Sequence, residues 1–137
     1  MQASLLHRAL PMALTVGIFL TGCSDSTTPP PPPGIQPEIV NVTDSFEYQV
    51  QSVSDYSRTA SYTWTNTGTV AAVDHSSVVS DGVGTLEILD ADGNQVYSGT
   101  LAASGSTQSA AGTSGGWTVR ITYAAFSGTV NFRVQKA

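Results

Sequence analysis

Residues 38–137 predict an all-β domain: a single antiparallel β-sandwich, jelly-roll-like, of about eight strands. Apolar and polar side chains alternate along several short segments, and no sustained helical period occurs. A period of two is typical of strands with one buried face. Clusters of Gly, Asn, Asp and Ser separate the segments, as the turns of a sandwich require. This range of about 100 residues has the size of one small domain.

The strands follow from local patterns along the chain. The first, 46–51, alternates aromatic or aliphatic side chains with Glu and Gln. Further segments are rich in the β-branched and aromatic residues that strands favour. They span residues 60–66, 70–75, 84–89 and 95–101.

The last two predicted strands have the clearest pattern. Residues 117–123 and 130–134 each alternate strictly between apolar and polar side chains. The short segment 124–128 between them predicts a hairpin connection. We therefore expect these strands to pair antiparallel, with both apolar sets on one face.

The N-terminus has the three parts of a secretory signal peptide. His7 and Arg8 precede an apolar segment, Ala9 to Leu20, which contains Pro11 and is followed by small residues. About a dozen residues are too few to cross a membrane, which needs roughly 20. We assign residues 1–22 to this signal peptide.

The end of this region, Leu20-Thr21-Gly22-Cys23, resembles the lipobox of bacterial lipoproteins. The resemblance implies cleavage between Gly22 and Cys23 and a diacylglyceryl group, with palmitate-type chains, on the Cys23 sulfur. Two or three acyl chains anchor a protein stably. The alternative is an ordinary secreted protein with a free cysteine. Ser24, where inner-membrane lipoproteins usually carry Asp, favours the outer membrane, facing the periplasm or the exterior.

Residues 23–37 predict a disordered, Pro-rich tether between the lipidated cysteine and the domain. Pro29 to Pro33 is an unbroken run, and Gly34 and Pro37 follow. The segment has no hydrophobic face to bury, so burial cannot offset the entropy of ordering it. A polyproline II run is semi-rigid and rises about 3.1 Å per residue, so it would hold the domain away from the membrane.

Three segments of the C-terminal half share a further pattern. They are a strand with an Asp-x-x-Gly turn at 84–93, a Gly-Trp-x-Val strand at 115–120 and a closing strand at 128–134. Together they resemble the bacterial pre-peptidase C-terminal domain and related jelly-roll modules. The resemblance implies a non-catalytic accessory module, although no peptidase or other enzyme domain accompanies it here.

Asp90, Asp92 and Asn94 place oxygen-bearing side chains at alternate positions, as the start of an EF-hand calcium loop does. Gly93 comes two positions too early, however, and Leu101 stands where such a loop needs Glu. A tight turn is the favoured interpretation. A weak calcium or ligand loop is the alternative.

The run Asp74-His75-Ser76-Ser77 has the residue types of a hydrolase triad. Neighbours on a strand point to opposite faces, however, and no nucleophile-elbow sequence surrounds either serine. His75 is the only histidine after residue 22, and a lipidated Cys23 leaves no thiol. We therefore predict neither a triad nor a confident metal site.

Two tyrosines are candidate ligand-facing aromatics. Tyr56 lies in the polar run 54–58, and Tyr97 has Val96 beside it pointing to the opposite face. We expect the other large aromatic side chains of these strands in the core: Tyr62, Trp64, Trp117 and Tyr123.

The sequence therefore favours a lipid-anchored, non-catalytic envelope protein that acts as a binding or structural accessory module. The alternative is a surface carbohydrate-binding or adhesive module with contacts at 90–94 and Tyr56; an envelope hydrolase would need a polar constellation that the sequence does not supply. Expected partners are the membrane, through acyl chains on Cys23, and an envelope protein or glycan. Nucleic acid is excluded because, without residues 1–22, four basic side chains face ten acidic ones.

Overall fold

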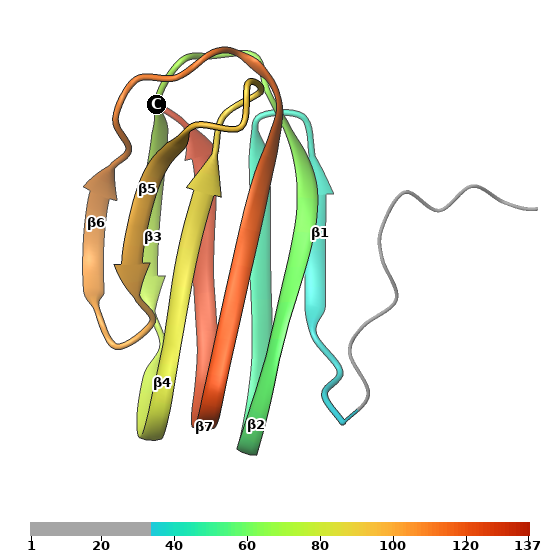
Figure 1. Cartoon of the computed structure of the whole chain (residues 1–137), viewed down its shortest axis with the longest axis vertical. Coiled ribbons are helices and arrows are strands. Elements are labelled where there is room, and N and C mark those ends of the chain that lie inside the picture. Colours follow the sequence, from blue (N-terminus) through green and yellow to red (C-terminus); the bar gives the residue numbers. More distant parts are fainter. Residues whose placement is uncertain (1–33) are drawn as a thin grey trace, which may run out of the picture.

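The computed structural model describes residues 34–137, and this part of the chain is all-β, as predicted. Seven antiparallel strands form one sheet (Figure 1). In chain order they are β1 (Glu38–Val42), β2 (Ser45–Asn66), β3 (Ala71–Ser76), β4 (Val78–Leu89), β5 (Gln95–Thr100), β6 (Ser104–Gln108) and β7 (Gly115–Lys136). The predicted signal peptide, the lipobox and most of the tether lie outside the described residues. Between residues 34 and 137 no helix is long and apolar enough to cross a membrane.

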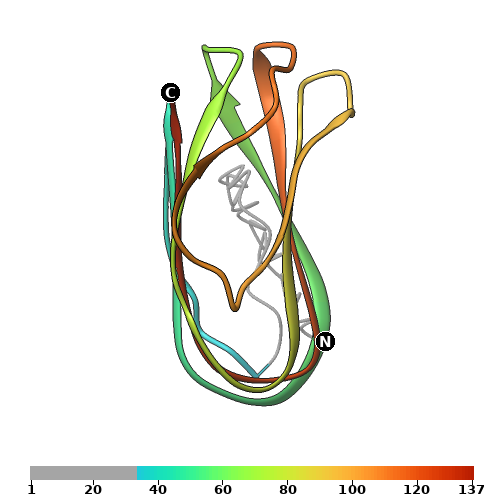
Figure 2. The ribbon, with the colours of Figure 1, turned by 90° about the vertical axis from the view of Figure 1, so that its left-hand side faces the viewer.

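The sheet is bent double, so that a single sheet supplies both layers of a sandwich (Figure 2). β2 and β7 have 22 residues each and run through both layers. In the first layer, residues 45–50 pair with 130–135, and in the second layer, residues 58–66 pair with 115–123. β1, β3 and β6 complete the first layer, whereas β4 passes from the bend into the second layer and pairs there with β5.

The prediction of a hairpin at 124–128 was wrong. Residues 117–123 and 130–134 belong to one continuous strand, β7, that bends between the layers. Their apolar sets do lie on one face of the sheet, but they reach the core from opposite layers. The period of two is the same in a hairpin and in a bent strand, so the pattern alone does not distinguish them.

The bend holds because neighbouring strands pair with β7 on both sides of it. Tyr56 of β2 lies opposite Phe126, and Val79 of β4 lies opposite Gly128. Register shifts mark β-bulges in both β2 and β4 at this point. Bulges bend a strand and increase its twist, which lets the sheet turn back on itself.

Positive φ angles also concentrate at the bend. Non-glycine residues seldom adopt them, yet Ser52, Asp55 and Ala125 have φ values of 56°, 44° and 45°. Gly82, with φ 71°, approaches β7 so closely that a side chain there would overlap the carbonyl oxygen of Ala125. The bend is therefore built from local conformations that the alternation of side chains does not encode.

The core lies between the layers and is rich in aromatic rings. Trp64 and Trp117 meet edge to face with ring centroids 5.9 Å apart, and Phe132 stacks on Tyr48 at 5.3 Å. Such pairs contribute about 0.5–1.5 kcal/mol each beyond burial alone. The aromatic residues expected in the core are all buried: Tyr62, Trp64, Trp117 and Tyr123.

Hydrogen bonds close both sides of the folded sheet. On the β1 side, the Asn41 side-chain amide donates to the Thr63 carbonyl oxygen in the second layer at 2.9 Å. On the opposite side, the N–H groups of Ser109 and Ala110 donate to carbonyl oxygens of β3 and β5, each at 2.8 Å. These contacts cover edge groups that would otherwise invite pairing with another chain.

Besides residues 124–128, four strand regions were not predicted: β1, β6, the first half of β4 and residues 52–59 of β2. β6 has no apolar side chain, is exposed throughout and pairs with β3. A strand held at an edge through its backbone has no hydrophobic period to recognise. Two pairs of the seven expected segments merged into β2 and β7, and the unpredicted β1 and β6 bring the observed count to seven.

Candidate functional site

The segment 90–94 is a turn organised by Asp90. Asp90 is 4% exposed, and its carboxylate accepts hydrogen bonds from the N–H groups of Asp92, Asn94 and Thr113 at 3.0, 2.8 and 3.0 Å. The bond from Thr113 is the main reason that the pKa of Asp90 is lowered, against the opposing effect of burial. Gly93 supplies a positive φ of 85°, as the turn interpretation requires.

The same contacts bear on the alternative interpretation of this segment as a weak calcium or ligand loop. Asp92 accepts a hydrogen bond from the Thr113 hydroxyl at 2.6 Å, and Glu87 forms an ion pair with Arg120 at 3.5 Å. Within residues 34–137 no three His, Cys, Asp or Glu side chains gather closely enough to hold a metal ion. The carboxylates of this loop therefore join the turn to the segment at Thr113.

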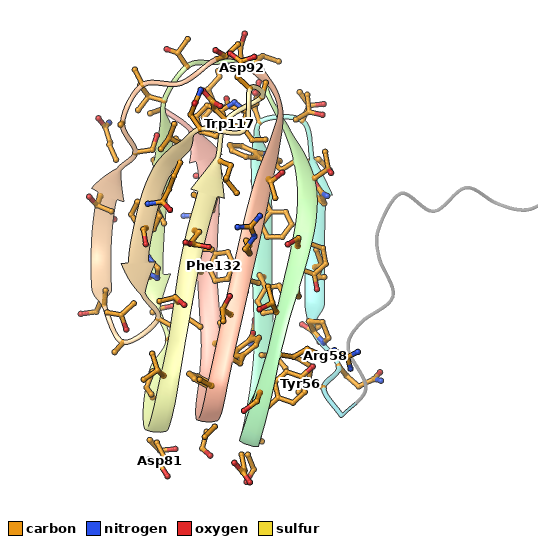
Figure 3. The ribbon with its side chains drawn as sticks, viewed as in Figure 1. Tyr56, Arg58, Asp81, Asp92, Trp117 and Phe132 are labelled. Atoms are coloured by element: carbon orange, nitrogen blue, oxygen red, sulfur yellow. The ribbon has the colours of Figure 1, made fainter. Side chains whose placement is uncertain are left out.

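Tyr56 and Tyr97 are not exposed, contrary to the prediction. Tyr97 lies opposite Ile88 on the inner face of the sheet, and its hydroxyl is hydrogen-bonded to His75 Nε2 at 2.7 Å. Tyr56 packs edge-on against Tyr123 with centroids 5.3 Å apart, at the bend (Figure 3). Every aromatic ring from residue 34 onward is buried or half-buried, so this region offers no exposed ring pair for stacking a sugar.

The reason for the error at Tyr97 is a local register change. A β-bulge between Ile88 and Leu89 shifts the pairing of β4 with β5. Val96 is buried in the core, as expected, and it also lies against the chain near Gly112. Both neighbours are therefore covered, because the extra residue in β5 interrupts the alternation at this point.

Asp74 and His75 point to opposite faces, as predicted. Asp74 faces outward, where it accepts a hydrogen bond from Ser106 and pairs with Arg133 at 3.7 Å. His75 faces inward and is 6% exposed, between the rings of Tyr97 and Phe132. They cannot act together on one substrate.

Burial makes His75 the one group from residue 34 onward whose titration should weaken the fold near neutral pH. Desolvation lowers the pKa of His75, and the nearby Asp74 carboxylate opposes this only in part. As pH falls through the ordinary histidine value of about 6.5, the unfolded chain therefore binds the proton first. The free energy of unfolding is therefore lower below this pH than above it.

We expect urea unfolding to show a lower midpoint at about pH 5.5 than at about pH 7.5. His75→Gln should flatten this difference, because the only other histidine is His7, in the predicted signal peptide. Tyr97→Phe keeps the imidazole and should preserve the pH dependence. An equal midpoint at both pH values in the unsubstituted protein would contradict this account of His75.

A charged row crosses the outer surface of the first layer. Glu47, Arg133, Asp74 and Ser106 lie directly opposite one another on β2, β7, β3 and β6. Arg133 stands between the two carboxylates, 3.9 Å from Glu47 and 3.7 Å from Asp74. These groups are about half exposed, so solvent screens the pairs and leaves them open to a ligand.

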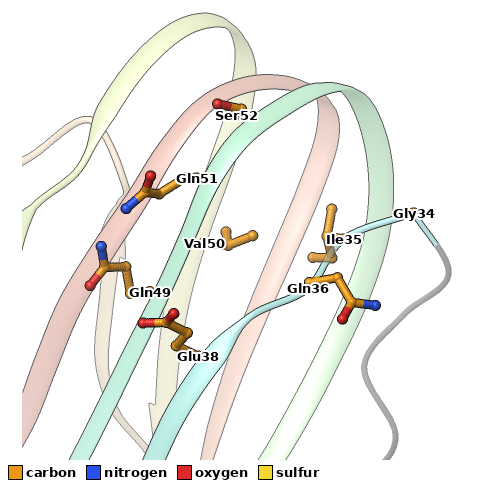
Figure 4. Close-up of a pocket in the computed structure, with 8 residues that line it drawn as sticks. All are labelled: Gly34, Ile35, Gln36, Glu38, Gln49, Val50, Gln51 and Ser52. Atoms are coloured by element: carbon orange, nitrogen blue, oxygen red, sulfur yellow. The ribbon is translucent and has the colours of Figure 1, made fainter.

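Several hollows lie along this charged row or beside it. One, about 410 Å³, lies at the rim of the first layer where the entering segment 34–38 meets residues 49–52 of β2 (Figure 4). A second, about 260 Å³, surrounds Asp74 and Arg133. A third, about 100 Å³, lies between them.

The third hollow joins the other two into a track. It shares Glu38 and Gln49 with the first and Glu47 and Asn131 with the second. We call this outer surface the polar face. It is defined by Glu38, Glu47, Gln49, Asp74, Asn131 and Arg133.

The polar face was missed at the level of sequence for a simple reason. Glu47 and Gln49 occupy the polar half of an alternating strand, and so do Asn131 and Arg133. Such positions are usually only solvated. The signal that distinguishes them is cross-strand register, which brings distant polar positions into one row and which no local pattern contains.

The fold and the polar face define an all-β, sandwich-like domain with a hollowed polar surface. No protein-family model matches the chain, and neither the comparison with curated proteins nor that with solved structures gave a match. The functional argument therefore depends on the chain's own residues.

Proposed function

We propose that the protein is a lipid-anchored, non-catalytic lipoprotein of the bacterial envelope that acts as a binding module. The lipobox-like sequence ending at Cys23, behind an apolar segment too short to span a bilayer, supports the anchor. The looser resemblance of the C-terminal half to pre-peptidase C-terminal domains supports an accessory role. Ser24 supports the outer membrane as the location.

The observation that carries the binding role is the polar face. Its hollows are contiguous, and its six defining side chains carry hydrogen-bonding groups but include no serine, threonine, cysteine or histidine. The triad-like residues support the absence of catalysis, because Asp74 and His75 point to opposite faces.

The position of the chain entry fits an anchored module. Gly34, the first described residue, lies beside Tyr56 at the bend, and the turn containing Asp92 lies at the opposite end of the molecule (Figure 3). The entering segment 34–38 lines the first hollow, whereas none of its residues lines the hollow around Asp74 and Arg133. A membrane-held domain could therefore present its polar face to envelope material.

The test is the substitution Cys23→Ala, followed by cell fractionation. Without the sulfur no acyl chain can be attached, so the protein should move from the membrane to the soluble fraction while keeping its β-sheet circular dichroism. Ser26→Ala, three residues further on, should leave the protein in the membrane. Retention of the Cys23→Ala protein in the membrane would rule out the proposed anchor.

A surface carbohydrate-binding module is the second candidate. The specific observation in its favour is the set of amide side chains along the hollows, including Gln36, Gln49 and Gln51. The contacts suggested by the sequence, Tyr56 and the 90–94 turn, do not support it, because the first is packed and the second is occupied by internal hydrogen bonds.

A further inference from the structure

We infer that the polar face binds a neutral, hydroxyl-rich chain, which in a cell envelope means an uncharged glycan. The inference rests on the proposed binding function and specifies its ligand class. It depends on four properties of the polar face: its extent, its charge, the availability of its backbone groups and its lack of exposed rings.

The extent of the polar face suits a chain better than a single small molecule. The hollows run from Gln51, next to the bend, past Gln49 and Asn131 to Arg133. Together they cross three neighbouring strands, β2, β7 and β3. Strands lie about 4.8 Å apart, so the track is long enough for more than one sugar unit.

The charge of the polar face excludes acidic ligands. Glu38, Glu47 and Asp74 contribute three carboxylates, and Arg133 contributes the one guanidinium among its six defining residues. Arg133 is already flanked by two of those carboxylates. A uronic-acid or phosphate-bearing polymer would meet net negative charge, whereas a neutral polymer would not.

The remaining hydrogen-bonding capacity is in the side chains. None of the hydrogen bonds found between residues 34 and 137 uses the side-chain amide of Gln49 or of Asn131. Each amide offers a donor and an acceptor, the combination that a hydroxyl group can satisfy. The flanking carboxylates and the guanidinium add further acceptors and donors.

The backbone beneath the polar face is fully engaged in the sheet. The first half of β2 pairs with β1 and β7, and β7 pairs in turn with β3. An extended peptide adds to a sheet through free edge groups, which the middle of this layer does not offer. The apolar side chains below the track, Val50 and Phe132 among them, are buried. Among the residues that line the hollows, Val40 is the one exposed apolar side chain, so the track offers a peptide little apolar surface.

The lack of exposed aromatic rings limits the affinity that we expect for the glycan. Stacking on an aromatic ring normally supplies much of the buried area in a sugar site, and from residue 34 onward no ring is exposed. Binding through side-chain hydrogen bonds in contact with water is weak for each contact. We expect a Kd on the order of 1 mM.

The experiment is frontal affinity chromatography on the intact lipidated protein, immobilised in detergent. The probes are neutral hexasaccharides of glucose and of N-acetylglucosamine, with a hexamer of a uronic acid for comparison. At least one neutral probe should be retained, and the acidic hexamer should bind at least tenfold more weakly. The double variant Gln49→Ala/Asn131→Ala should weaken retention about tenfold. Gln95→Ala, an exposed glutamine on β5, is the matched control and should leave retention unchanged.

Three results would overturn the inference: no neutral probe is retained, the acidic hexamer binds as well as the neutral probes, or the double variant binds like the unsubstituted protein. Circular dichroism checks that the double variant is folded. These failures differ from failure of the proposed function. A protein that is released by Cys23→Ala but retains no saccharide is still an anchored lipoprotein, whereas one that stays in the membrane without Cys23 is not the protein proposed here.

Discussion

Replacing Gly128 by Ala is expected to lower the free energy of unfolding by about 3 kcal/mol or more. Gly128 has φ 147°, a conformation that side-chain-bearing residues rarely adopt. A Cβ atom there would also overlap the Val78 carbonyl oxygen of β4. Because that oxygen belongs to a backbone paired across the bend, neither strand can move without disturbing the fold of the sheet. Urea unfolding followed by circular dichroism measures the loss.

Gly105→Ala is the matched control. Gly105 also has a positive φ, 96°, but its surroundings are open, with no atom within 4 Å of an added Cβ. Alanine there should cost only the conformational term, about 1 kcal/mol. If both variants lost the same small amount of unfolding free energy, the close approach at Gly128 would not constrain the bend.

Trp117→Ala is expected to cost about 3–5 kcal/mol, the range for removing a large buried aromatic side chain. Trp117 is fully buried and packs edge to face on Trp64. Its indole N–H also donates to the Thr113 carbonyl oxygen at 2.7 Å. The substitution therefore removes core volume and the contact that holds the segment before β7.

Phenylalanine substitutions separate these two contributions. Trp117→Phe keeps a ring but loses the bond to Thr113, whereas the indole N–H of Trp64 has no partner in the described part of the chain. Trp64→Phe should therefore cost less than Trp117→Phe by about 1 kcal/mol. A larger cost for Trp64→Phe would show that the hydrogen bond to Thr113 contributes little.

Alternation of side chains predicted the fold class and much of the core. It identified the inward set around Tyr48, the set around Val119 and the set around Phe132, because burial of one face requires a period of two in any antiparallel sheet. The same reasoning placed Trp64 in the core and assigned Asp74 and His75 to opposite faces.

What the sequence did not predict depends on relations between strands. The bend in β7 needs bulges in β2 and β4 together with Gly128 in an unusual conformation. The inward direction of Tyr97 follows from a bulge at Val96, which is defined only by the pairing of β5 with β4. The polar face exists only because register brings Glu47, Arg133 and Asp74 into one row. No single segment contains this information.

The fold also explains how a chain with a single cysteine can be stable without disulfides. Cys23 lies outside residues 34–137, so that part of the chain is held by its packed core and by the hydrogen bonds that close its sides. Joining both layers through the long strands β2 and β7 means that the layers cannot separate without breaking the strands themselves.

The most direct test of the central claim, that this is a lipid-anchored binding domain, is mass spectrometry of the N-terminal peptide of the protein purified from membranes. The account predicts that the mature chain begins at Cys23 and that this residue carries a diacylglyceryl group, with or without a third acyl chain. A mature chain that begins elsewhere, or an unmodified Cys23 thiol, would contradict it.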